Sequence, residues 1–103
     1  MSGFRVVVTE TAEEQIGEAA DWWAEHRPKA PELFAEEIER GFVVLATFPL
    51  TGAVYAASPV PGVRRLLLRR CGYHLYYSVD EEGEVVAVRA LWHAARGRGP
   101  AAE

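Results

Sequence analysis

The stretch from Arg64 to Arg96 constrains the fold most, because it contains three successive runs rich in Val, Leu, Tyr and Trp. β-Branched and aromatic residues at this density are typical of strands rather than helices. The first two runs meet at Cys71-Gly72, and the last two meet at a polar turn, Asp80 to Gly83. The stretch therefore predicts an antiparallel meander of three strands.

Alternation along these runs predicts one apolar and one basic face for the meander. A two-residue loop at Cys71-Gly72 would place Leu68 opposite Leu75 on the apolar face. An even-length second turn adds every second residue from Val86 to Trp92 to that face, whereas an odd one would push Arg89 into the core at a high desolvation cost. With the even turn, the opposite face collects Arg65, Arg69, His74, Tyr76, Arg89 and His93.

The first half of the chain predicts one strand and two helices. Residues 4–8 form a short edge strand, and Thr9 or Thr11 caps a helix that ends near Pro28. Pro31 suits the first turn of a second helix, which ends at Pro49. Phe34, Ile38, Phe42 and Leu45 mark the buried stripe of that helix, with Glu36, Glu37, Glu39 and Arg40 outside.

The region from Pro49 to Gly62 has three prolines and two glycines, and it predicts a loop. The element order is then β-α-α-β-β-β, an α+β fold of two layers with a helical hairpin on one face of a mainly antiparallel sheet. The second face is left bare and basic. A partner or ligand is the natural expectation for such a surface.

Length and composition indicate a single domain over residues 1–96, with a flexible tail over 97–103. No apolar run approaches the roughly 20 residues of a membrane helix. No signal peptide is recognisable, and one cysteine leaves no intrachain disulfide, so we expect a cytoplasmic protein without cofactor or metal.

Charge is distributed unevenly along the chain. Residues 1–50 carry four Lys or Arg against ten Asp or Glu, whereas residues 51–103 carry seven Arg against five acids. Four of those five acids lie between Asp80 and Glu84, so the predicted sheet itself is basic. Arginine is the side chain suited to carboxylate and phosphate recognition, although ordinary surface charge explains the pattern equally well.

Four short motifs, in this order, resemble the RelE/ParE family of bacterial type II toxin–antitoxin toxins. They are Pro49-x-x-Gly52, Gly62-Val63-Arg64, Tyr73-x-Leu75-x-Tyr77 and Leu91-Trp92-His93-x-x-Arg96. The resemblance covers Val6 to Arg96, and the last motif is most similar to the ParE branch. It implies a growth-inhibiting toxin, of the kind linked to plasmid stabilisation, that a cognate antitoxin neutralises by wrapping over its surface.

The family resemblance leaves the target open. ParE-like members are taken to inhibit DNA gyrase by protein binding, which is the function we expect, with Arg64, His93 and Arg96 at the functional end. The first alternative is a RelE-like toxin, because RelE-like members cut mRNA on the ribosome. The second alternative is an inactive relative that only binds its antitoxin. The assembly expected is a homodimer or a heterotetramer with the antitoxin.

Metal-independent RNA cleavage needs a base, an acid and cations around one phosphate. His93, Arg65, Arg96 and Tyr76 would supply these groups, with His74 as a second histidine. Each histidine can instead have a structural role. His93 can cap the end of its strand by hydrogen bonding, and His74 can be an exposed strand residue. The single lysine and the acidic helices disfavour ribosomal RNA as a target. We therefore favour no catalytic residue and expect partner binding through Arg64, Arg65, Arg69, His74, Tyr76, Arg89, His93 and Arg96.

Overall fold

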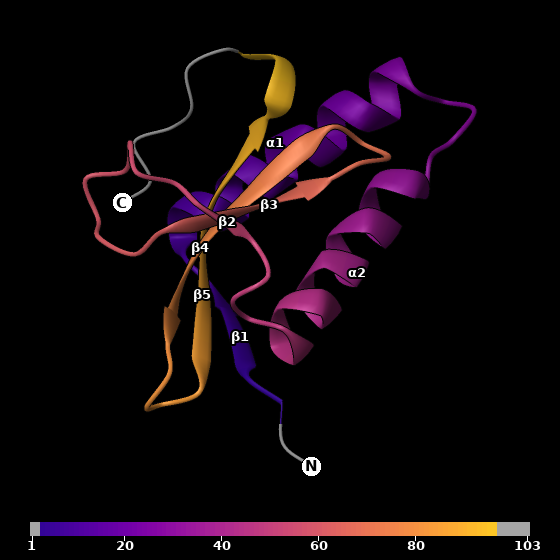
Figure 1. Cartoon of the computed structure of the whole chain (residues 1–103). Coiled ribbons are helices and arrows are strands. Elements are labelled where there is room, and N and C mark those ends of the chain that lie inside the picture. The colour runs from indigo at the N-terminus through magenta and orange to yellow at the C-terminus, as the bar shows by residue number, and fades with distance from the viewer. Residues whose placement is uncertain (1–2, 97–103) are drawn as a thin grey trace.

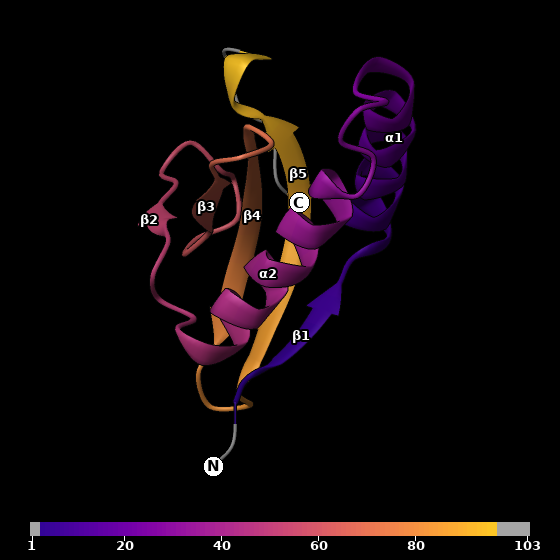
Figure 2. The same cartoon turned by 90° about the vertical axis from the view of Figure 1, so that its right-hand side faces the viewer.

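The computed structural model describes residues 3–96, without the side chain of Arg96. It is the expected two-layer α+β fold, in which two helices cover one face of a five-stranded sheet (Figures 1 and 2). The elements are β1 (Arg5–Val8), α1 (Glu10–His26), α2 (Leu33–Thr47), β2 (Ala53–Val54), β3 (Arg64–Leu68), β4 (Tyr73–Asp80), β5 (Val85–His93) and the 3₁₀ turn η1 (Ala94–Arg96). Residues 97–103, predicted to be a flexible tail, lie outside the described part.

The sheet has the strand order β1-β5-β4-β3-β2. β1 runs parallel to β5 at one edge, and the remaining pairs are antiparallel. β2 lies inside the segment predicted to be only a loop, and its two residues pair with Arg64 and Arg65. The predicted edge strand and meander are therefore confirmed, and the connecting segment adds one short strand.

The β3–β4 connection is longer than predicted. Leu68 pairs with Tyr73, so four residues rather than two form the loop. Gly72 adopts a φ of 78°, and its N–H donates to the Leu68 carbonyl at 2.8 Å. A shift by an even number of residues keeps each side chain on its predicted face. The register was wrong, but the division of β3 and β4 into two faces holds.

A β-bulge in β5 changes the predicted faces of its last residues. Tyr77 pairs with Val88 but Tyr76 pairs with Ala90, so Arg89 is an extra residue. Beyond the bulge, Leu91 faces the helices opposite Leu75, whereas Ala90 lies opposite Tyr76 on the other face. The four-residue second turn has the predicted even length, but the apolar series from Val86 to Trp92 does not stay on one face.

Helix α1 stabilises this irregular part of β5. β1 ends at Val8, so within the described part of the chain the backbone of β5 beyond Val88 has no neighbouring strand on that side. The hydroxyl of Thr9 donates to the Arg89 carbonyl at 3.4 Å, and Oε1 of Gln15 accepts from the Leu91 N–H at 2.9 Å. Thr9 is also the N-cap of α1, since its hydroxyl accepts from the Ala12 N–H at 3.2 Å. The segment from Thr9 to Gln15 thus begins α1 and also provides hydrogen-bond partners for the backbone of the bulged strand.

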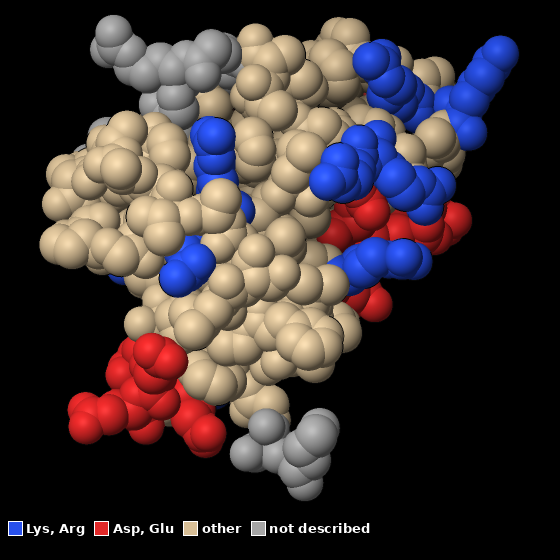
Figure 3. Space-filling model, viewed as in Figure 1, with Lys and Arg blue, Asp and Glu red and all other residues tan. Residues whose placement is uncertain are grey.

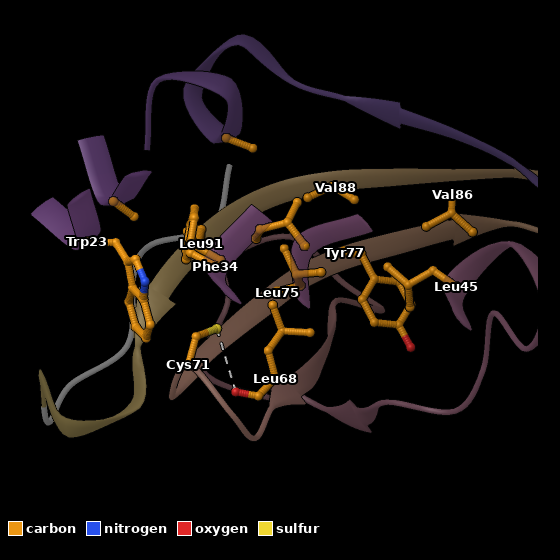
Figure 4. Packing of buried hydrophobic residues seen from close by; sticks show 13 residues of the cluster. Trp23, Phe34, Leu45, Leu68, Cys71, Leu75, Tyr77, Val86, Val88 and Leu91 are labelled. Carbon is orange, nitrogen blue, oxygen red and sulfur yellow. Dashed lines mark hydrogen bonds between the residues drawn. The ribbon is translucent and has the colours of Figure 1, made fainter. Parts of the chain in front are cut away.

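The main core lies between the helices and the sheet (Figure 4). Leu75 and Tyr77 of β4 are fully buried there, together with Leu45 of α2. Gly41 allows α2 to approach the sheet, because a Cβ at this position would lie 2.9 Å from a Leu75 methyl carbon. The glycine therefore permits a close approach between α2 and the sheet.

Candidate functional site

The sheet face away from the helices, here called the second face, is not bare as predicted. Val63, Tyr76 and Ala90 form a small buried cluster on it, covered in part by Tyr55 and Val60 of the β2–β3 connection. The Tyr55 ring packs edge-on against Tyr76, with centroids 4.8 Å apart. Tyr76 is only 1% exposed. It therefore serves as the floor of the surface and is not available for stacking or proton transfer.

Arg65 and His74 lie beside this aromatic cluster on neighbouring strands. The Arg65 guanidinium carbon stands 5.6 Å from the centre of the Tyr55 ring, and the His74 ring lies 5.9 Å from that of Tyr76. Burial, followed by the charge of Arg65, lowers the pKa of His74 below its ordinary value of 6.5. His74 is thus neutral at physiological pH, and Arg65 supplies the charge here.

Arg89 adds a second cation to the second face. Its Nη1 donates to the Ser78 hydroxyl at 3.4 Å, whereas its buried Nε has no hydrogen-bond partner among the described residues. Removing a guanidinium from water without a full set of acceptors is costly. The side chain lies on the second face as predicted, where its Nη atoms can donate to an anionic group of a partner.

Arg64 has a structural role that the sequence reading did not assign. Its Nη1 donates to the Gly52 carbonyl at 2.7 Å and to the Leu50 carbonyl at 3.3 Å. The Gly52 N–H donates to the Tyr77 hydroxyl at 2.8 Å. A Cβ at Gly52 would lie 2.6 Å from the Arg65 carbonyl oxygen, so only glycine fits. Three of the family-like motifs therefore meet in one structural clamp that holds the turn after α2.

Arg69 was predicted to lie on a strand of the basic face, but it lies in the β3–β4 loop. Both Arg69 and Arg70 are exposed in this loop. The loop is fixed by Glu37, whose Oε1 accepts from the Arg70 N–H at 2.9 Å. Glu37 was predicted to face solvent, but it is 7% exposed. Burial raises the pKa of the neighbouring Cys71 thiol, and the charge of Glu37 adds to the effect. Cys71 is accordingly a structural residue rather than a nucleophile.

His93 was predicted to share a face with Arg65 and Arg89, and this prediction was wrong. It lies opposite Tyr73 on the helix side of the sheet, with ring centroids 4.9 Å apart. Its Nδ1 accepts from the Ala95 N–H at 3.1 Å. The imidazole thus closes the end of β5, the structural alternative considered for it. Arg96 follows as the last residue of η1.

Trp92 and Tyr55 are the second-face residues that the sequence reading missed. Trp92 lies opposite His74 and packs against the small cluster, although the alternation predicted it for the core. The bulge that moves it leaves no pattern in the sequence. A signal did exist for Tyr55, because it is the one large aromatic residue in the region predicted as a loop.

Figure 3 shows how charge is distributed on one side of the molecule, with one acidic patch apart from the cations and other acidic side chains beside them. Acidic side chains gather over the β4–β5 turn, and basic ones gather over the β3–β4 loop and the α1–α2 connector. Among residues 3–96, no group of three His, Cys, Asp or Glu side chains could hold a metal ion. None of the described helices is long and apolar enough to cross a membrane. The second face, with Arg65 and the partly satisfied Arg89 beside an aromatic floor, is suited to binding an anionic surface.

The fold and its clamp define a small toxin-like domain, and comparison with protein families identifies the class. Residues 6–97 match the model of the ParE toxin of type II toxin–antitoxin systems. This match spans most of the chain, so the chain belongs to that family. A search of curated proteins finds no match.

Several solved structures share this fold. A chain of the chromosomal ParDE system of P. aeruginosa is 22% identical, with a TM-score of 0.66 over 87% of this chain and 95% of that chain. A chain of the RelBE2 toxin–antitoxin complex of Mycobacterium tuberculosis is 24% identical, with a TM-score of 0.64 over 90% and 93%. One from the intact E. coli RelBE complex is 21% identical, with a TM-score of 0.59 over 90% and 99%.

Proposed function

We propose that the chain is a toxin that inhibits DNA gyrase by protein binding and that a cognate antitoxin neutralises it in the cytoplasm. One observation carries the preference for binding over RNA cleavage. The expected acid–base groups do not converge, because His93 lies on the helix side of the sheet and Tyr76 is buried. Membership of the ParE family supports the toxin part of this proposal, and the toxin–antitoxin complexes among the structural neighbours support a cognate antitoxin.

In this proposal the second face contacts an acidic patch of the partner. Arg65 and Arg89 flank the Tyr76 floor, since Arg65 pairs with Tyr76 and Tyr76 pairs with Ala90 next to the bulge. Arginine beside aromatic residues is the composition enriched at binding hot spots. Arg64 and His93 act indirectly, because each holds the backbone at one end of this surface.

A supercoiling assay with purified toxin and gyrase tests the proposal. Wild-type toxin at micromolar concentration is expected to block supercoiling. Replacing Arg65 and Arg89 together by Gln should weaken inhibition at least about tenfold. Replacing Arg27 and Lys29, two exposed cations of the α1–α2 connector, removes the same charge elsewhere and should leave inhibition unchanged. Full gyrase activity at micromolar wild-type toxin contradicts the proposal.

Ribosome-dependent mRNA cleavage is the second candidate, and the position of His74 near Arg65 on the same face of neighbouring strands is the observation that favours it. A neutral imidazole beside an arginine combines a base with a phosphate-binding cation. This version of the ribonuclease uses His74 and Arg65 in place of His93.

Toxin-expressing cells distinguish the two candidates. A ribonuclease produces codon-phased cuts in translated mRNA that His74→Gln abolishes and His93→Gln spares. Intact transcripts during growth arrest remove this candidate. Normal growth without the antitoxin would instead indicate an inactive, antitoxin-binding relative.

A further inference from the structure

The end of α2, the start of β1 and the β4–β5 turn come together at the base of the molecule (Figure 2). Residues of these three segments line an apolar hollow. We call it the basal hollow. Its volume is about 550 Å³, within the usual range of ligand sites. It is remote from the clustered second-face residues, none of which lines it. Its main lining residues are Phe4, Phe48, Pro49, Leu50 and Glu81.

Two large apolar side chains of the basal hollow are turned to solvent. Phe48 is 65% exposed and Leu50 is 49% exposed. Single exposed apolar residues are ordinary, but a hollow lined by several of them, with a polar rim, marks an interaction site. Their burial by a partner would release water from both side chains.

The backbone around the basal hollow is preformed. The Phe48 N–H donates to the Val44 carbonyl at 2.7 Å, and the Thr51 N–H donates to the Phe48 carbonyl at 3.1 Å. On the other side, the Phe4 N–H donates to the Ala46 carbonyl at 2.9 Å. The Arg64–Gly52 clamp fixes the exit of the same turn. A partner therefore meets a rigid apolar surface and loses little affinity to ordering it.

The rim of the basal hollow is strongly acidic. Glu81 lines it, and Glu82 and Glu84 are exposed on the same turn. Asp80 holds this turn in shape, since its Oδ1 accepts from the Gly83 N–H at 3.1 Å. Figure 3 shows these acids as one patch. The cations nearby in the fold are Arg5, whose N–H donates to the Glu84 carbonyl, and Arg64, whose guanidinium is held by carbonyls. The carboxylates outnumber them.

We propose that the basal hollow docks a cationic amphipathic segment of a partner protein. One large apolar side chain of the segment fills the space between Phe48 and Leu50, and lysines or arginines of the segment lie over the β4–β5 turn. Opposite charge at the rim steers the encounter and rejects acidic segments. The rim of the basal hollow is acidic, whereas the second face is basic. The basal hollow and the second face therefore select different partners or different parts of one partner.

Fluorescence anisotropy with two designed peptides tests the proposal without any knowledge of the natural partner. One labelled peptide of about four helical turns carries Leu and Trp on one side and Lys on the other, and its match carries Glu in place of every Lys. The lysine peptide is expected to bind at least about tenfold more tightly than the glutamate peptide, and high salt should reduce this difference.

Variants locate the binding. Phe48→Ser and the pair Glu81→Lys with Glu82→Lys should each weaken the lysine peptide about tenfold. Val54→Ser, at a site 63% exposed on β2, and the pair Glu14→Lys with Glu18→Lys on α1 are the matched controls and should have no effect. Equal binding of the two peptides, or equal effects of the controls, overturns the proposal.

Sedimentation velocity tests whether a second copy of this chain, rather than a partner protein, occupies the basal hollow. A dimer that dissociates on Leu50→Lys assigns the basal hollow to self-association and overturns the proposal. A monomer that binds the lysine peptide at this site supports it. Neither measurement involves gyrase, so failure here is distinct from failure of the proposed inhibition.

Discussion

The two faces of the sheet are built differently. The helix side buries thirteen residues in one cluster, whereas the second face buries three beneath a connecting segment. On the helix side the polar groups of Glu37 and Tyr77 have hydrogen-bond partners. On the second face the Nε of Arg89 has none among residues 3–96. Stability therefore comes mainly from the helix side, whereas the second face keeps an arginine with one buried and unsatisfied N–H.

Truncating one leucine on each face tests this comparison with the largest expected effect. Leu75 is fully buried on the helix side, whereas Leu67, one strand away on the second face, is 38% exposed. Leu75→Ala should lower the free energy of unfolding by about 3 kcal/mol, because it removes buried methyl groups and leaves a cavity. Leu67→Ala should cost less than about 1 kcal/mol. Urea denaturation measures both, and similar losses would show that the faces contribute equally.

Glu37 tests whether buried polar groups on the helix side are structural. Glu37→Ala should cost about 2 kcal/mol, because the Arg70 N–H loses its charged acceptor. Glu37→Gln keeps an acceptor of the same shape and should cost less. Thermal unfolding of the two variants gives the difference. If alanine and glutamine were equally harmful, the carboxylate charge would matter more than the hydrogen bond.

Gln15 tests the origin of the bulge at Arg89, which turns Trp92 to the second face and His93 to the helix side. Gln15→Met removes the acceptor for the Leu91 N–H and should cost about 1 kcal/mol. Gln15→Glu retains an acceptor and is the control. The indole N–H signals in an NMR spectrum report the environment of Trp92. A stability loss without any movement of these signals would mean that the bulge does not depend on α1.

The smallest expected effect is a change in the pKa of His74 on the second face when the charge of Arg65 is removed. Its pKa lies below 6.5 through burial and the charge of Arg65, so Arg65→Gln should raise it. A histidine with a depressed pKa binds its proton less readily in the folded than in the unfolded state. Its contribution to stability is therefore complete above pH 6.5 and decreases as the pH falls toward the folded-state pKa.

NMR titration of the His74 ring protons measures this shift directly. Lys29→Gln, which removes an exposed cation from the α1–α2 connector, is the control. An unchanged His74 pKa in Arg65→Gln would leave burial as its only cause.

Much of the candidate site could be placed from the sequence, because strand alternation has a period of two. Arg65, His74, Tyr76 and Arg89 were assigned to one face, and the structure places them there even though the β3–β4 loop is two residues longer than predicted. The burial of Tyr76 was not predictable in the same way. It depends on Tyr55, which comes from a proline-rich segment whose path no periodicity describes.

The sequence by itself determined the order of the elements apart from the short strand β2, the helix-covered face and the resemblance to toxins, because these follow from local propensity, periodicity and short motifs. Only the tertiary structure decided the positions of His93, Glu37 and Arg64. The bulge at Arg89 is stabilised by Thr9 and Gln15, about 75 residues or more away along the chain. Hydrogen bonds between distant segments leave no local pattern, and they decide which side chains of the last strand lie on the second face and which pack on the helix side.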